Sequence, residues 1–324
     1  MNYPAVGVVI IGRNEGSRLV NCLDSLAEFT PQVVYVDSAS TDNSIAEAKN
    51  RGAHVVSLDM TKAFTAARAR NAGFDAITSL FPDIKYVQFV DGDCEVLSGW
   101  IHQALIFLEN NQQVAVVNGV LNERFPNQSI YNFLCDAEWK LSKGEIKYCG
   151  GNALMRADVF KAMGGFLPNL IAGEEPELCV RLRKCGWKIW HLEEQMMLHD
   201  ANITSFFQWW KRTIRAGYAY AEGSSMHGAH PERHWVAESR RAWLWGFTIP
   251  VMIVVVCFFS WKLSMLMTLV YPLQIARLAM KNKSHKNWQQ AFFLVLGKFA
   301  EMIGQLKFFK QKYLKEEISL IEYK

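Results

Sequence analysis

The first 121 residues alternate short apolar runs with longer amphipathic stretches, and this alternation constrains the fold more than any other feature. The apolar runs are Val6–Ile11, Val33–Val36, His54–Leu58, Tyr86–Val90 and Val114–Val120. The stretches between them, such as 17–29 and 65–80, are long enough for crossover helices and have apolar residues at helical spacing. Strands that alternate with helices form a mostly parallel sheet. We therefore expect an α/β domain with a Rossmann-like sheet.

Polar side chains follow three of these apolar runs. Asn14 and Glu15 follow the first run, Asp37 follows the second, and Asp91 and Asp93 follow the fourth. Ligands of open α/β sheets bind beyond the carboxyl ends of the strands. We therefore expect the functional site at this edge of the sheet.

Asp91 and Asp93 place two like charges close together. Residues i and i+2 of an extended chain point the same way, so both carboxylates can face one spot. A divalent cation such as Mg²⁺ or Mn²⁺ would remove their repulsion and could bind a diphosphate. The alternatives are a solvated turn, which the tripeptide alone favours, and two carboxylates that share a proton.

The sequence has no glycine-rich phosphate loop of either common type, G-x-G-x-x-G or G-x-x-x-x-G-K-[ST]. If the chain binds a nucleotide, a metal ion must therefore contact the phosphates. Glu174 and Glu175 form a third acidic site at the start of an expected helix. A carboxylate there could be a general base, although acidic residues also stabilise helix N-termini without any catalytic role.

The composition changes beyond residue 240. Residues 242–259 are uncharged and rich in Val, Trp and Phe, and residues 263–276 form a second uncharged run. Basic residues lie on both flanks, namely Arg240, Arg241, Arg277, Lys281, Lys283 and Lys286. This pattern predicts a membrane hairpin at about 242–280 with both ends in the cytosol, and the alternative is a buried hairpin of a soluble domain. An amphipathic helix follows, either at the membrane interface or packed in the cytosol.

Charge and cysteine content narrow the class of protein. The net charge of +4 is mild, and no arginine-rich arm is present, so we expect no nucleic-acid partner. The seven cysteines include no C-x-x-C pair, which favours reduced thiols in the cytosol. The N-terminus lacks a basic n-region, so we expect no signal peptide. We expect two domains, at residues 1–235 and 236–324.

Six segments together resemble the membrane-associated, exopolysaccharide-type members of the family 2 inverting glycosyltransferases, which have the GT-A fold. The segments are VVIIGRNE (8–15), VYVDSASTDNS (34–44), ARARNAG (67–73), VDGD (90–93), GGNALMR (150–156) and GEEPELCVRLR (173–183). They occur in the order of the family and span residues 6 to about 222 with their surroundings. The resemblance implies a GT-A domain and a D-x-D metal motif at Asp91 and Asp93.

The resemblance also implies roles for single residues. Asp37 would contact the nucleotide base, and Arg70 and Asn71 would line the same pocket. Asn14 and Glu15 would belong to the same nucleotide-sugar site. Asp91 would face the ribose and the metal, and Asp93 would bind the metal directly. His199 stands where many relatives have a metal-binding histidine, although a lone histidine after a strand is more often structural.

The base position departs from the family pattern. Relatives usually have Glu-Asp where this chain has Glu174 and Glu175. The second acid of the pair would be the base, which favours Glu175, and its longer arm leaves its reach open. Residues 208–212 only partly match the Gln-x-x-Arg-Trp motif of processive synthases, so we expect transfer of a single sugar.

These observations predict a metal-dependent enzyme, using Mn²⁺ or Mg²⁺, that moves one sugar from a nucleoside-diphosphate sugar to an acceptor hydroxyl. A UDP-sugar is the favoured donor and a lipid-linked glycan of surface polysaccharide synthesis the expected acceptor. The catalytic domain would face the cytoplasm at the inner membrane. One alternative is a non-catalytic nucleotide-sugar-binding module of a polysaccharide assembly complex. Another is a nucleotidyltransferase, for which residues 12–16 form a poor triphosphate cradle.

Overall fold

The computed structural model describes residues 5–281 and 286–314. The chain forms two compact units, which we call the N-terminal unit (residues 1–202) and the C-terminal unit (residues 203–324). The sequence predicts a domain boundary near residue 235. The two compact units divide after Asn202, so the long helix at 206–227 groups with the C-terminal helices, and the boundary near residue 235 stays a prediction.

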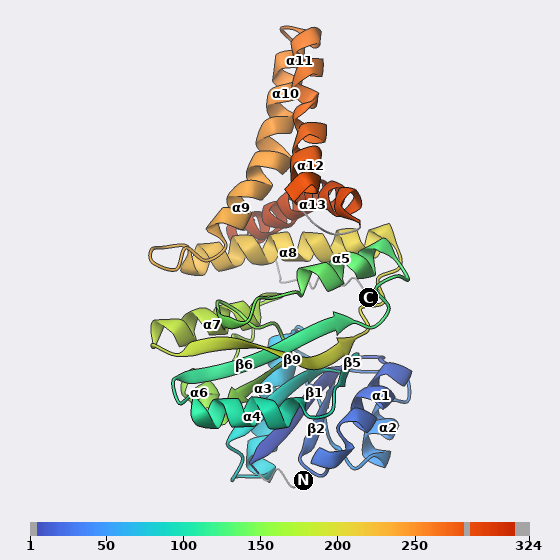
Figure 1. Cartoon of the computed structure of the whole chain (residues 1–324), viewed down its shortest axis with the longest axis vertical. Helices are drawn as coiled ribbons and strands as arrows, with labels where there is room; N and C mark the ends of the chain where they lie inside the picture. The colour runs from blue at the N-terminus through green and yellow to red at the C-terminus, as the bar shows by residue number, and fades with distance from the viewer. Residues whose placement is uncertain (1–4, 282–285, 315–324) are drawn as a thin grey trace. The chain divides into compact units, whose positions relative to one another are not determined.

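A mixed β-sheet forms the centre of the N-terminal unit (Figure 1). Its strands follow the order β3-β2-β1-β4-β8-β6-β9-β5, and β7 pairs with β9. The strands β1 to β4 are parallel, whereas β8 runs antiparallel to both β4 and β6. All five strands expected up to residue 121 are present. The strand bounds are β1 (Val6–Gly12), β2 (Val33–Asp37), β3 (His54–Ser57), β4 (Tyr86–Asp91), β5 (Cys94–Val96), β6 (Val114–Glu123), β7 (Gly144–Ile146), β8 (Ala153–Arg156) and β9 (Lys188–His199).

Helices cover both faces of this sheet, which explains why β1 is apolar on both sides. Leu19 and Trp100, from α1 and α4, pack with Val8 in one core cluster. Phe74 and Leu178, from α3 and α7, belong to the cluster on the opposite face. The helix bounds are α1 (Ser17–Ser25), η1 (Ala27–Phe29), α2 (Ser44–Asn50), α3 (Ala66–Leu80), α4 (Trp100–Asn110), α5 (Ile130–Glu138), α6 (Ala157–Ala162) and α7 (Glu174–Lys184).

The strand register brings the predicted acidic residues to one edge. Gly12 pairs with Asp37 across β1 and β2, and Ile11 pairs with Asp91 across β1 and β4. The N–H of Gly92 donates to the carbonyl of Ile11 over 2.8 Å, which holds the chain beyond β4 against β1. The carboxyl ends of these parallel strands therefore meet at one edge, as the sequence predicts.

The C-terminal unit is helical, and its helices cross at glycines. A Cβ atom at Gly217 of α8 would lie 2.0 Å from the carbonyl oxygen of Glu301 in α13, so the two backbones are in contact there. A Cβ at Gly304 would likewise lie 2.0 Å from the carbonyl oxygen of Ile214. One side of α13 thus packs against α8. The bounds are α8 (Phe206–His227), α9 (Val236–Trp243), η2 (Leu244–Thr248), α10 (Ile249–Cys257), α11 (Trp261–Thr268), α12 (Val270–Lys281) and α13 (Asn287–Leu314).

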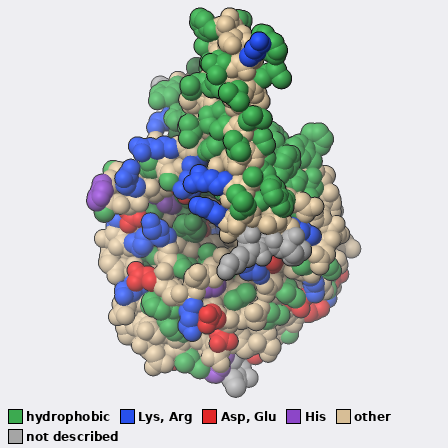
Figure 2. All heavy atoms as spheres, turned by 45° about the horizontal axis from the view of Figure 1, so that its top comes forward, with side chains coloured by type: hydrophobic (Ala, Val, Ile, Leu, Met, Phe, Trp, Pro, Cys, Tyr) green, Lys and Arg blue, Asp and Glu red, His purple; other side chains and the backbone are tan. Residues whose placement is uncertain are grey.

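Two helical segments of this unit are long and apolar enough to cross a membrane. They span Val236–Cys257 and Trp261–Lys281, each with a mean hydropathy of 1.4, and only 11% of the apolar window of each is buried. Phe258 and Phe259, in the turn between them, are 85% and 86% exposed. Figure 2 shows hydrophobic side chains over the surface of this hairpin. Lys283, one of the predicted flanking cations, lies outside the described residues.

Candidate active site

Asp91, at the end of β4, is neutralised by a buried arginine. Nη2 of Arg70 donates to its Oδ1 over 2.6 Å. The amide of Asn152 also contacts it: Oδ1 of Asn152 accepts from the Asp91 N–H over 2.8 Å, and Nδ2 donates to Oδ2 over 3.4 Å. The charge repulsion expected between Asp91 and Asp93 is therefore reduced by Arg70, a partner within the protein.

Asp93 pairs with the predicted histidine. Nε2 of His199 lies 3.2 Å from Oδ2 of Asp93, whose side chain is only 3% exposed. The antiparallel pairing of β5 and β9 places Cys94 opposite His199 and so brings the two side chains together. The ring of His199 stacks on Trp139, with centroids 4.6 Å apart and planes 15° apart. The structure thus gives the histidine a fixed orientation toward Asp93.

Arg70 connects two parts of the site. Its second terminal nitrogen, Nη1, lies 2.5 Å from Oε1 of Glu174, at the start of α7. Burial opposes the charge of Arg70, but the carboxylates of Asp91 and Glu174 outweigh that effect and raise its pKa. A Cβ at Gly151 would lie 2.4 Å from Nη2, so only glycine leaves room for the guanidinium. This arginine therefore fixes the start of α7 to the end of β4.

Glu175, the expected base, lies in a buried setting with two thiols. Its Oε1 accepts from the N–H of Cys149 over 2.7 Å, and it lies 3.1 Å from Sγ of Cys149 and 2.9 Å from Sγ of Cys179. The residue is only 3% exposed. Burial raises the pKa of Glu175, and these hydrogen bonds oppose that rise.

The residues assigned to the nucleotide lie around the ends of β1 and β2. Asp37 is buried and accepts from the N–H of Ser40 over 3.0 Å and from the Tyr35 hydroxyl over 3.1 Å. Oδ1 of Asn14 accepts from the N–H of Thr41 over 2.7 Å, which joins the loops after the two strands.

Glu15 and Asn71, which are also predicted to belong to the nucleotide-sugar site, contact other parts of the protein. Glu15 forms an ion pair of 2.7 Å with Arg18. The side chain of Asn71 forms two hydrogen bonds with the backbone of Phe166: Nδ2 donates to the carbonyl over 2.7 Å, and Oδ1 accepts from the N–H over 3.0 Å. The structure therefore gives Asn71 a role in holding the loop that precedes α7, and its predicted contact with the nucleotide stays a prediction.

Three further residues shape the site without having been predicted. Asn152 contacts Asp91, Trp139 stacks on His199, and Cys149 contacts Glu175. Asn152 belongs to the GGNALMR segment, so its motif offered a signal. Trp139 and Cys149 had none, because their roles depend on which residues the fold places beside them.

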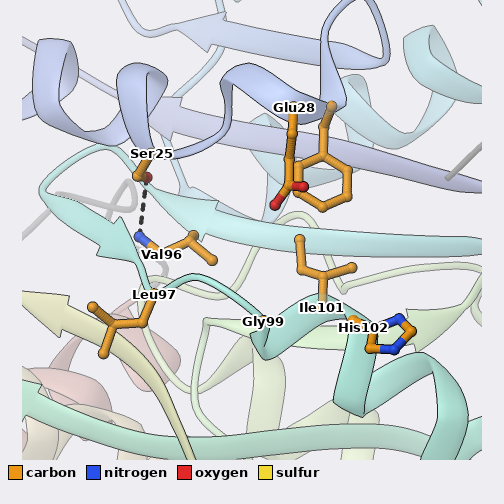
Figure 3. Close-up of a pocket in the computed structure, with 8 residues that line it drawn as sticks. Ser25, Glu28, Val96, Leu97, Gly99, Ile101 and His102 are labelled. Carbon is orange, nitrogen blue, oxygen red and sulfur yellow. Dashed lines mark hydrogen bonds between the residues drawn. The ribbon is translucent and has the colours of Figure 1, made fainter. Parts of the chain in front are cut away.

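A separate small hollow lies where the end of α1 approaches the start of α4 (Figure 3). Ser25, Glu28 and His102 are among its lining residues, and the Ser25 hydroxyl accepts from the N–H of Val96 over 3.1 Å. None of the predicted site residues lines it. The acidic edge therefore remains the candidate site.

Comparison with known sequences identifies the domain that carries this edge. Residues 7–164 match the sequence model of glycosyl transferase family 2. The N-terminal unit carries a glycosyl transferase family 2 domain. The match includes Asp37, Arg70, Asp91 and Asp93, whereas Glu174, Glu175 and His199 follow it. A comparison with curated proteins found no match.

Solved structures with a similar fold are also glycosyltransferases. The mannosyltransferase PcManGT from Pyrobaculum calidifontis, in complex with GDP-Man and Mn²⁺, has a TM-score of 0.64 and 17% identity over 94% of this chain and 89% of its own. Glucosyl-3-phosphoglycerate synthase from Mycobacterium tuberculosis, with Mg²⁺ and UDP, has a TM-score of 0.49 and 16% identity over 69% of this chain and 79% of its own. At these identities the likeness to PcManGT establishes the fold, which is GT-A.

The glycosyl transferase domain has a donor set that suits a hard divalent cation. Mn²⁺ and Mg²⁺ favour carboxylate oxygen, and imidazole is compatible with Mn²⁺. The 3.2 Å between the Asp93 oxygen and the His199 nitrogen is near the separation of about 3.0 Å expected for adjacent octahedral ligands at about 2.1 Å. Nδ1 of His199 is buried and has no hydrogen-bond partner within residues 5–281 and 286–314. The residues therefore fit a metal at Asp93 and His199.

Proposed function

We propose that this chain is an inverting, metal-dependent glycosyltransferase that moves one sugar from a nucleoside-diphosphate sugar to an acceptor hydroxyl. The observation that supports it most is the meeting of Asp91, Asp93 and His199 at the carboxyl edge of the sheet, with Glu174 and Glu175 at the adjoining helix start. In this proposal a metal contacts the diphosphate, and the lack of a glycine-rich phosphate loop in the sequence supports that assignment.

Asp93 and His199 would hold Mn²⁺ or Mg²⁺ in this proposal. When bound, the metal supplies positive charge to the departing diphosphate. Asp37, at the end of β2, receives the base of the nucleotide. Arg70 keeps Asp91 and Glu174 in place, so that the donor side and the acceptor side of the site keep a fixed separation.

The transfer needs one base. The acceptor oxygen forms a bond to the anomeric carbon, the bond from that carbon to the diphosphate oxygen breaks, and the hydroxyl proton passes to Glu175. Attack from the face opposite the diphosphate inverts the anomeric centre. The raised pKa of Glu175 makes its carboxylate a stronger proton acceptor than an ordinary glutamate.

The apolar hairpin supports a membrane location and a lipid-linked acceptor. Segments of 22 and 21 residues reach about 30 Å as helices, which is the thickness of the hydrocarbon core. Arg240 and Arg241 lie in the first turns of one segment, and Arg277 and Lys281 lie near the end of the other, so four basic residues lie at the open end of the antiparallel pair and one, Lys262, lies beside the turn. This asymmetry supports a cytoplasmic location of both ends of the hairpin and of the catalytic domain.

A binding experiment tests the donor and metal roles together. Nucleoside diphosphates and their sugars, UDP-sugars first, are screened for a rise in melting temperature with and without Mn²⁺, because a ligand of the native state stabilises it. Asp93→Asn and His199→Ala should lose the Mn²⁺-dependent rise. Asp75→Asn is the matched control, since Asp75 is an exposed residue of α3. If no nucleotide shifts the wild-type chain in either condition, the proposal fails.

A second measurement separates an enzyme from a binding module. Glu175→Gln should keep the nucleotide-dependent shift and lose release of nucleoside diphosphate in the presence of membrane extract as acceptor source. Transfer that continues at the wild-type rate in Glu175→Gln would contradict the base assignment. A wild-type chain that binds donor but releases no diphosphate would favour the non-catalytic module.

A further inference from the structure

A second group of potential metal ligands is buried in the N-terminal unit, apart from Asp93 and His199. It consists of Cys149, Glu175 and Cys179. The two sulfur atoms lie 4.0 Å apart, and Oε1 of Glu175 lies 3.1 Å and 2.9 Å from them. Glu175 and Cys179 are one turn apart on α7, and Cys149 comes from the loop before β8. All three donor atoms therefore converge on one point.

We propose that this cluster, which we call the thiol site, binds a thiophilic divalent cation of the Zn²⁺ type. Zn²⁺ takes thiolate sulfur at about 2.3 Å and carboxylate oxygen at about 2.0–2.2 Å. A point about 2.3 Å from both sulfurs and about 2.1 Å from the oxygen satisfies all three observed separations, with a sulfur–metal–sulfur angle of about 120° and sulfur–metal–oxygen angles of about 80–90°. Three protein ligands leave a fourth position open.

A series of buried hydrogen bonds fixes the metal-binding atoms of Cys149 and Glu175. The N–H of Cys149 donates to Oε1 of Glu175 over 2.7 Å. The carbonyl of Cys149 accepts from Nδ2 of Asn118 over 2.7 Å, and Oδ1 of Asn118 lies 3.1 Å from Nδ1 of His191. Since the Asn118 oxygen can only accept, Nδ1 of His191 carries the proton. Such outer contacts hold metal ligands in position and strengthen binding.

The thiol site differs in chemistry from the site at Asp93. Two thiols and one carboxylate favour a thiophilic ion, whereas the group at Asp93 combines a carboxylate and an imidazole with a single thiol, that of Cys94. A thiol must lose its proton to bind a metal as a thiolate, so binding should release one proton from each of the two cysteines. Affinity should fall steeply as the pH falls.

If Glu175 is the base of the proposed function, a metal in the thiol site should inhibit sugar transfer. A bound ion takes the Glu175 carboxylate as a ligand, so it can no longer accept the proton of the acceptor hydroxyl. Thiophilic cations should then inhibit transfer even when Mn²⁺ is saturating. This inhibition would be noncompetitive with the donor, because the ion and the nucleotide use different residues.

Cobalt absorbance tests the thiol site without any activity assay. The full-length chain in detergent is saturated with Mg²⁺ and titrated with Co²⁺, which gives a sulfur-to-cobalt charge-transfer band when thiolates bind it. One equivalent is expected, and the band should be lost in Cys149→Ser and in Cys179→Ser. Cys135→Ser is the matched control, since Cys135 is a buried thiol of α5 outside the site. No band in the wild-type chain, or equal bands in all four proteins, would overturn the proposal.

Two further measurements keep the test decisive if a serine variant does not fold, as circular dichroism would show. Zn²⁺ should raise the melting temperature of the wild-type chain. Binding should also release about two protons per ion into a weakly buffered indicator solution. Binding without proton release would contradict thiolate ligation. Failure of the nucleotide screen leaves these outcomes unchanged, so the two proposals fail separately.

Discussion

The two ion pairs of Arg70 lead to a sharp prediction about stability. Arg70→Ala leaves the carboxylates of Asp91 and Glu174 without their partner, and their side chains are only 29% and 11% exposed. Removing one partner of a buried ion pair costs about 3–5 kcal/mol, because the remaining charge stays buried and uncompensated. Arg70→Lys should lie between wild type and alanine, since one ammonium cannot donate along two directions as the guanidinium does.

Arg51 is a matched control with the same pairing at the surface. It lies 2.6 Å from Asp24 and 2.5 Å from Glu47, and those two carboxylate side chains are 60% and 36% exposed. Exposed pairs contribute about 0–1 kcal/mol, so Arg51→Ala should cost no more than about 1–2 kcal/mol for both pairs. The two arginines thus differ mainly in burial.

Thermal unfolding of the full chain in detergent measures the difference. For a domain of this size 1 kcal/mol shifts the midpoint by about 2–4 °C, so Arg70→Ala should lower it by about 6–20 °C and Arg51→Ala by no more than about 2–8 °C. Circular dichroism before heating confirms that each variant is folded. Equal shifts for the two variants would refute the argument that burial of the two carboxylates determines the cost.

Three further outcomes follow from the structure. Gly217→Ala should destabilise the C-terminal unit by about 3 kcal/mol or more in chemical denaturation, because its Cβ would lie 2.0 Å from a backbone oxygen. Gly297→Ala is the control: its Cβ would lie 3.4 Å from Thr213, so the substitution should be neutral or stabilising by up to about 1 kcal/mol. Burial raises the pKa of Glu222 to about 7, so the native state binds more protons than the unfolded state between about pH 4.5 and 7 and loses stability as the pH rises. Glu222→Gln should therefore raise the free energy of unfolding at pH 8 by about 1–2 kcal/mol, and show no gain below pH 4.5. Because burial raises the pKa of Glu175, transfer should fall as the pH falls through a value above the ordinary 4.5, and a profile flat down to pH 4.5 would contradict its role as base.

Much of the fold follows from local patterns. The apolar runs and helical spacing predicted the strands β1 to β4 and β6 and the helices between them, because both periodicities are properties of neighbouring residues. The apolar composition beyond residue 240 likewise predicted two long helices. The position of β8 between β4 and β6 in the sheet, and its antiparallel direction, could not be predicted, because this pairing joins residues far apart in the chain.

The sequence by itself determined which acidic residues end the strands, because that depends only on where each apolar run stops. It could not determine their partners. Arg70 meets Asp91, 21 residues away, and Glu174, 104 residues away, and only the packing of α3, β4 and α7 brings them together. The tertiary structure also decided that two adjacent glutamates differ: Glu174 pairs with the arginine, while Glu175 lies against Cys149 and Cys179. Successive residues of a helix point about 100° apart, so neighbours in sequence enter different surroundings.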